Sequence, residues 1–308
     1  MISLLAAALL VVSVDGLDQR YLDNPSLKIP HLRRVIGIVP TVTWPSHTTI
    51  LTGADAWDHG GDYYWSVSLL KRPTLLDAAA KAALKTATFC QDIAARFQSF
   101  RKEWMDDRTR LLATRYLLQK ADAVFVHLLD LDSEAHAIGE MLAALPKGGR
   151  FVLVSDHGFE TAVKSVNLKF AAERDKIGGI EIRGGFVIAS GPPAAAWLRQ
   201  LSPEHAIGRE IPADEIARFA PPLTGKFLFE PAPGVWFGPG NDVLIAKPHE
   251  TGNHGHWPTR YRSVYAAWGP GIRPARLPEM RITEIADRLA SLAIATVFME
   301  TTQNRVIL

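Results

Sequence analysis

The chain has 308 residues, of which 47% are hydrophobic and 21% are charged. This composition excludes collagen-like, coiled-coil and wholly disordered chains, and the length fits one α/β domain over residues 1–308. A net charge of +2 gives no reason to expect nucleic-acid binding by bulk electrostatics. Cys90 is the single cysteine, so no disulfide forms within the chain and a metal ion would need His, Asp or Glu ligands.

The first fourteen residues are almost all apolar and lead into the turn sequence Asp15-Gly16. They lack the basic region and the cleavage site of a signal peptide, and they are too short to cross a membrane. Residues 9–14 are therefore predicted to form a buried strand, and no transmembrane segment is expected. Residues 1–7 stay open as the remnant of a targeting segment.

Further apolar, β-branched runs indicate strands, and stretches of helical spacing lie between them. The strand candidates are 35–39, 123–129, 151–154, 185–189 and 264–268, and the helix candidates are 74–84, 107–120, 140–145 and 285–298. Alternating strands and helices predict an α/β fold with a mostly parallel sheet that is covered on both faces. Residues 161–249 are richer in Gly and Pro, and we interpret them as a smaller cap inserted into the main domain.

Carboxylate and imidazole side chains gather where predicted strands end. Three short polar segments follow a strand directly, and a fourth would reach the same edge by a loop; their candidate metal ligands are Asp15, Asp132, His136, Asp156, His157 and His254. Ligands collect at the carboxyl ends of parallel strands, and three carboxylates with three imidazoles suit two divalent ions, with zinc favoured. Taken singly, Asp15 is also a plain turn residue, and Asp132 with His136 is also a pair on one helix face.

A Thr- and Ser-rich segment after the strand candidate 35–39 supplies a nucleophile. A hydroxyl needs a base or a metal for activation, and Thr43 beside a zinc ion would ionise. Pro45 suits the first turn of a helix, where free N–H groups favour a phosphate. The same residues are also compatible with an ordinary helix start that has no chemistry.

Taken together, these segments resemble the alkaline phosphatase superfamily, and within it the type I phosphodiesterase/nucleotide pyrophosphatase family. The shared order is Asp-Gly, Thr-Trp-Pro-Ser-His, Asp-Ser-x-x-His, Ser-Asp-His-Gly and Gly-x-His-Gly, over residues 9–297. The resemblance implies a three-layer α/β/α sandwich and two Zn²⁺ ions, one held by Asp132, His136 and His254, the other by Asp15, Asp156 and His157. It further implies that Thr43 attacks phosphorus and forms a covalent phosphothreonine, which water then hydrolyses.

The implied substrate is a small phosphate ester or nucleotide. Trp44 is a candidate for stacking on a nucleobase, with a packing role as the alternative, and Ser46 replaces the family's usual Asn as a donor to a phosphoryl oxygen. Phosphomonoesterase, phosphonate hydrolase and a catalytically degenerate metal-binding protein stay open as alternatives. The family resemblance suggests a periplasmic or secreted protein, with the cytoplasm still possible, and the sequence leaves the oligomeric state open.

Overall fold

The computed structural model of the chain describes residues 8–22, 33–60, 70–89, 114–115, 117–118, 120–129, 131–183, 185–201, 203–238, 243–248, 252–273 and 278–293. The chain divides into two compact units. The first unit comprises residues 1–37, 43–156 and 262–308, and the second comprises residues 38–42 and 157–261. Among the described residues, no helix is both long enough and apolar enough to span a bilayer.

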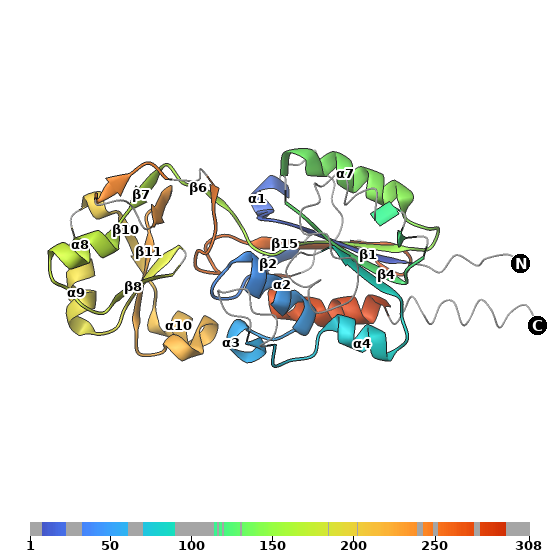
Figure 1. Ribbon diagram of the computed structural model, residues 1–308, viewed down its shortest axis with the longest axis horizontal. Helices are drawn as coiled ribbons and strands as arrows, with labels where there is room; N and C mark the ends of the chain where they lie inside the picture. Colours follow the sequence, from blue (N-terminus) through green and yellow to red (C-terminus); the bar gives the residue numbers. More distant parts are fainter. Residues whose placement is uncertain are drawn as a thin grey trace, which may run out of the picture. The chain divides into compact units, whose positions relative to one another are not determined.

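A seven-stranded sheet forms the centre of the first unit (Figure 1), in the order β16-β2-β15-β5-β1-β4-β3. Its strands are β1 (Leu9–Val14), β2 (Arg33–Ile36), β3 (Thr86–Phe89), β4 (Ala123–Leu128), β5 (Arg150–Ser155), β15 (Ser263–Trp268) and β16 (Met280–Arg281). All pairings are parallel except those of β15, which runs antiparallel to β2 and β5. The expectation of a mostly parallel sheet is confirmed.

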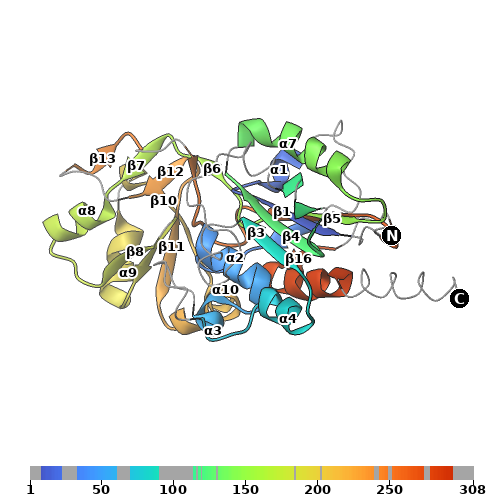
Figure 2. The same cartoon turned by 45° about the vertical axis from the view of Figure 1, so that its right-hand side comes forward.

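Helices cover both faces of this sheet. They are α1 (Gln19–Leu22), α2 (Thr43–Thr52), α3 (Ala56–His59), α4 (Leu75–Lys81), α7 (Leu131–Ala144) and the helical residues 285–293, which follow the 3₁₀ turn Ile282–Glu284. Helix α7 lies over one face, and α2, α4 and residues 285–293 lie over the other (Figures 1 and 2). The three-layer α/β/α architecture is thereby confirmed.

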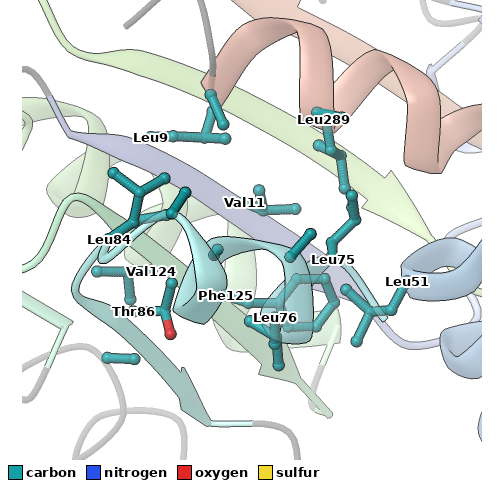
Figure 3. A pocket seen from close by; sticks show the side chains of 17 residues that line it. Leu9, Val11, Leu51, Leu75, Leu76, Leu84, Thr86, Val124, Phe125 and Leu289 are labelled. Carbon is teal, nitrogen blue, oxygen red and sulfur yellow. The ribbon is translucent and has the colours of Figure 1, made fainter. Parts of the chain in front are cut away.

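Alternation along β1 divides its side chains between the two faces. Leu10, Val12 and Val14 belong to the core cluster that contains Met141 of α7. Leu9 and Val11 point to the opposite face, where they line an apolar cavity of about 360 Å³ with residues of α2, α4 and 285–293 (Figure 3). The residue after Val11 on this face is Ser13, so the lining of this face turns from apolar to polar toward the carboxyl end of the strand.

Two predicted helices have different bounds in the structure. Helix α7 begins at Leu131 instead of residue 140, because the polar sequence Asp132-Ser133-Glu134 suits a first helical turn as well as a loop. The predicted helix 74–84 is α4, which starts after Thr74; the Thr74 hydroxyl and Asp77 form a capping box there. Most of the predicted helix 107–120 lies outside the described residues.

The second unit is built from smaller sheets. A four-stranded antiparallel sheet has the order β10-β11-β9-β8, a three-stranded sheet has the order β12-β7-β13, and β6 pairs with β14. The strands are β6 (Glu160–Thr161), β7 (Lys164–Val166), β8 (Ile180–Arg183), β9 (Phe186–Ala189), β10 (Ile207–Glu210), β11 (Phe227–Pro231), β12 (Val235–Phe237), β13 (Ile245–Ala246) and β14 (Gly252–Asn253). The helices are α8 (Leu168–Arg174), α9 (Pro192–Gln200) and α10 (Ala213–Phe219), with 3₁₀ turns Pro203–His205 and Pro221–Leu223.

One strand candidate lies outside the central sheet. The run 185–189 contains β9 (Phe186–Ala189) of the antiparallel sheet in the second unit, within the segment that is interpreted as a cap. Its four residues are all buried, so its composition matches that of a central parallel strand. The segment 161–249 lies within the second unit, and its role as a cap stays a prediction.

Candidate active site

The structure brings Asp15 and Asp156 together at one edge of the central sheet. They follow the neighbouring parallel strands β1 and β5. The turn after β1 uses Gly16 at a φ of +63°, a conformation that favours glycine. In this turn the Gly16 N–H donates to Asp156 Oδ1 at 3.1 Å. Asp156 is fully buried and Asp15 is partly exposed, so the two carboxylates form a concentrated negative site.

Thr43 lies beside Asp15. It is the first residue of α2, and its hydroxyl donates to Asp15 Oδ2 at 3.3 Å. Pro45 occupies the first turn of this helix, as expected, because its missing N–H costs no helical hydrogen bond there. The other two predicted substrate residues on α2 are buried: Trp44 is 5% exposed and Ser46 is 0% exposed. Their proposed roles stay predictions.

His47 lies one helical turn after Thr43 and was given no role in the sequence analysis. Its Nδ1 is 3.0 Å from the Thr43 carbonyl oxygen and its Nε2 is 2.8 Å from Ser13 Oγ. Because a carbonyl only accepts, the Nδ1 contact requires a proton on Nδ1, and in a neutral ring Nε2 then keeps a lone pair that can accept from the Ser13 hydroxyl or bind a cation. His47 therefore connects the helix that carries the predicted nucleophile to strand β1, which ends just before Asp15.

His127 is a second imidazole that the sequence analysis did not assign. It belongs to β4, and its Nε2 lies 3.3 Å from Asp15 Oδ2. The His127 and His47 rings meet edge-on, with their centroids 4.3 Å apart. The available signal was a histidine inside the otherwise apolar sequence Ala-Val-Phe-Val-His-Leu, because a buried polar side chain requires a partner.

The donor atoms of the first unit fit a divalent cation. Ligand atoms of His47, His127 and Asp156 all lie within 4.8 Å of one another, and these three residues are buried. Imidazole nitrogen and carboxylate oxygen are the donors that zinc accepts. Two adjacent carboxylates in a buried site are also favourable only when a positive charge accompanies them. The arrangement suits a metal ion without specifying which ion, or how many, it holds.

The second unit brings His157 and His254 together. His157 follows Asp156 directly in the chain, and His254 follows β14, which pairs with β6. The two rings are tilted by 32° with their centroids 4.3 Å apart. The family resemblance implies that these two imidazoles belong to different zinc ions. Of the remaining predicted ligands, Asp132 and His136 lie on helix α7, and their side chains are outside the described part of the structure.

A buried ionic network supports the segments that carry these two imidazoles. Glu160 lies three residues after His157, and its Oε2 is 3.4 Å from both His256 Nε2 and Arg260 Nη2. The Gly234 N–H donates to Glu160 Oε1 at 2.9 Å. Burial, together with a hydrogen bond to Glu160, raises the pKa of Tyr261 to about 12. Gly185 packs closely against this network, because a Cβ at position 185 would lie 2.5 Å from His256 Nδ1.

Residues 9–90 match the family model described as "Type I phosphodiesterase / nucleotide pyrophosphatase". The resemblance to this family is confirmed. The matched stretch contains the phosphodiesterase motifs around Asp15 and Thr43 but ends before Asp156. No curated protein sequence matches the chain significantly.

Solved structures of the same fold cover nearly the whole chain. Murine ectonucleotide pyrophosphatase/phosphodiesterase 5 aligns with a TM-score of 0.68 at 15% identity, over 93% of this chain and 95% of that one. Phosphonoacetate hydrolase from Sinorhizobium meliloti 1021, solved with phosphonoacetate, aligns with a TM-score of 0.67 at 16% identity, over 94% and 96%. Human ectonucleotide pyrophosphatase/phosphodiesterase 5 aligns with a TM-score of 0.66 at 14% identity, over 93% of this chain and 94% of that one. At these identities the alignments establish the shared, alkaline-phosphatase-like fold.

Proposed function

We propose that this chain is a metal-dependent phosphodiesterase of the nucleotide pyrophosphatase type with Thr43 as its nucleophile. The observation that carries the proposal is the hydrogen bond from the Thr43 hydroxyl to Asp15 Oδ2 at the start of α2. This contact joins the predicted nucleophile to a carboxylate that can take its proton. The family match over residues 9–90 supports a hydrolase of phosphoric esters.

The reaction follows from the positions of these groups. The Thr43 oxygen attacks phosphorus in line with the leaving oxygen, which departs as an alkoxide or a nucleotide oxyanion when the P–O bond breaks and takes a proton from water. The proton of Thr43 passes toward Asp15, and a phosphothreonine forms. Water then hydrolyses this ester and regenerates the hydroxyl. The N–H groups of the first turn of the ten-residue helix α2 are suited to hold phosphoryl oxygens, because they have no partner within the helix.

We assign two Zn²⁺ ions to this site. Asp15, Asp156 and His157 would hold the ion beside Thr43, and Asp132, His136 and His254 would hold the other. When bound, such ions lower the pKa of a nearby hydroxyl and offset charge on the attacking and leaving oxygens. The buried carboxylate of Asp156, held by the Gly16 N–H in the turn that carries Asp15, supports a cation in this region, and the paired rings of His157 and His254 support a shared role for those two residues.

The proposed substrate is a small phosphate diester or nucleotide. Trp44 would stack on the base, and Ser46 would donate to a phosphoryl oxygen. An inactive threonine-to-alanine variant of the murine enzyme was solved in complex with AMP, which supports a threonine nucleophile and a nucleotide ligand here. The complex of the bacterial hydrolase with phosphonoacetate favours a phosphonate hydrolase as the second candidate.

The test is a comparison of kcat/KM on zinc-loaded protein for bis-p-nitrophenyl phosphate, p-nitrophenyl phosphate and phosphonoacetate, with Thr43→Ala as the blank. We expect the diester to be preferred. A preference for the monoester would indicate a phosphatase, and a preference for phosphonoacetate would indicate the phosphonate hydrolase. Activity no higher than the blank on all three, with metal bound, would leave the chain as a metal-binding protein without turnover.

A further inference from the structure

A polar cluster lies under helix α2, on the sheet face that is apolar elsewhere. Toward the start of β1 this face carries Leu9 and Val11 beside the cavity. Further along the strand the same face carries Ser13 and then Asp15, by the alternation of side chains along a strand. The parallel register pairs Ser13 with His127 of β4. His127 therefore stands next to Ser13, on the face that leads to the site.

A single oxygen atom joins His127 to the proposed nucleophile. Asp15 Oδ2 lies 3.3 Å from His127 Nε2 and accepts the Thr43 hydroxyl, also at 3.3 Å. At this distance the imidazole and the carboxylate attract each other without the geometry of a hydrogen bond, and this attraction would restrict rotation of the carboxylate about its terminal torsion, which is otherwise broad. It would thereby keep the oxygen that Thr43 uses in one place.

The surroundings of His127 hold its ring in position. The residue is 2% exposed, and the ring meets the edge of His47 with the centroids 4.3 Å apart. His47 in turn contacts Ser13 Oγ at 2.8 Å and the Thr43 carbonyl oxygen at 3.0 Å. Burying two imidazoles at this position costs free energy of folding that an apolar pair would not cost. A role in the neighbouring site therefore explains the two histidines better than a role in stabilising the core does.

We propose that His127 is a positioning residue for Asp15, and through Asp15 for Thr43. The inference rests on the proposed function and deepens it. His127 contacts neither the substrate nor the reacting oxygen in this assignment. It fixes the Asp15 carboxylate, which accepts the hydrogen bond of the Thr43 hydroxyl and which is assigned as a ligand of the metal ion. Partners that orient metal-binding carboxylates affect metal affinity as well as turnover, which separates this role from that of a core histidine.

Three variants test the proposal. His127→Phe keeps the ring volume and removes the N–H, whereas His127→Gln keeps an N–H at about the reach of Nε2. Phe125→Leu is the matched control, because Phe125 is on the same strand and face and its ring also meets His47, with the centroids 6.0 Å apart. His127→Leu replaces the Phe variant if that variant does not fold. Zinc affinity is measured by competition with a chelator, next to kcat and KM for bis-p-nitrophenyl phosphate.

We expect His127→Phe to lower zinc affinity about 10- to 100-fold and to lower kcat by a similar factor with KM changed less than about threefold. His127→Gln should recover most of both losses, and Phe125→Leu should leave both close to the original. Zinc affinity and kcat within about twofold of the original in His127→Phe would overturn the proposal, and so would failure of His127→Gln to recover either.

Failure of the proposal for His127 can be distinguished from failure of the proposed function. If no ester is turned over, zinc affinity alone decides the role of His127. If zinc does not bind either, crystal structures of His127→Phe and His127→Gln decide it. An Asp15 carboxylate that still accepts the Thr43 hydroxyl in the Phe variant would overturn the proposal, and a rotated carboxylate that returns in the Gln variant would support it.

Discussion

Thr43 donates its side-chain hydrogen bond to Asp15, a residue 28 positions earlier in the chain. Asp15 directly follows strand β1 and Thr43 begins helix α2, so the contact joins the carboxyl end of a central strand to the positive end of a helix. A carboxylate acceptor and N–H groups that have no partner within the helix, at one place, are suited to a hydroxyl that attacks a phosphate.

The nucleophile is tested by removing and then restoring the hydroxyl. Thr43→Ala should lower kcat by at least about 10³-fold, because a covalent mechanism has no substitute nucleophile at this position. Thr43→Ser should retain measurable turnover, since a hydroxyl remains. Mass spectrometry after acid quench should find phosphate on Thr43 in the original protein. Thr43→Ala with undiminished turnover would remove Thr43 from the mechanism.

His254 is tested by counting metal ions. His254→Ala should lose about one zinc per chain, because a site with three protein ligands does not hold the ion tightly after losing one of them. His205→Ala is the control, since His205 is also a buried imidazole of the second unit but belongs to the 3₁₀ turn Pro203–His205. The measurement is the zinc content of purified protein by mass spectrometry. An equal zinc content in the two variants would exclude His254 from the ligand set.

The network around Glu160 predicts a loss of stability. Glu160→Ala should lower the free energy of unfolding by about 3–5 kcal/mol, because it removes the carboxylate that contacts both His256 and Arg260 and leaves Arg260 only the more distant Glu230, at 3.9 Å. Glu181→Ala is the comparison: Glu181 pairs with Arg183 at the surface, where both side chains are about half exposed, and its loss should cost less than about 1 kcal/mol. Urea unfolding of both variants measures the difference. Equal losses would show that the network does not stabilise the fold.

His59 predicts a dependence of stability on pH. Burial lowers the pKa of His59 from 6.5 to about 4, and its Nε2 lies 3.1 Å from Thr49 Oγ1. Because the unfolded chain binds the proton more readily, stability is complete above pH 6.5 and falls as the pH approaches 4. The free energy of unfolding falls by about 3 kcal/mol between pH 6.5 and 4 because of this residue. His59→Gln should flatten the stability curve between pH 6.5 and 4, and an unchanged slope would contradict the assignment.

Much of the fold could be predicted from local patterns. Apolar, β-branched runs bounded by polar turns correspond to β1, β4, β5 and β15, because such runs are stable mainly as buried strands. Asp15 and Asp156 could be singled out because they directly follow two of these strands. Thr43 could be singled out because Pro45 indicates a helix start. The run 185–189 could be predicted as a strand, but its partners could not, because burial makes a parallel strand and an antiparallel strand look alike.

Sequence patterns therefore account for the α/β class, for the strands that are followed directly by Asp15 and Asp156, and for the helix that begins at Thr43. The tertiary structure alone shows that His47 and His127 lie beside these groups. In sequence, each is a single histidine in an apolar context. The register that pairs Ser13 with His127 and the packing of α2 over that face bring them to Asp15 and Thr43. Both depend on contacts between distant segments, since a shift of one residue in register would turn His127 to the opposite face.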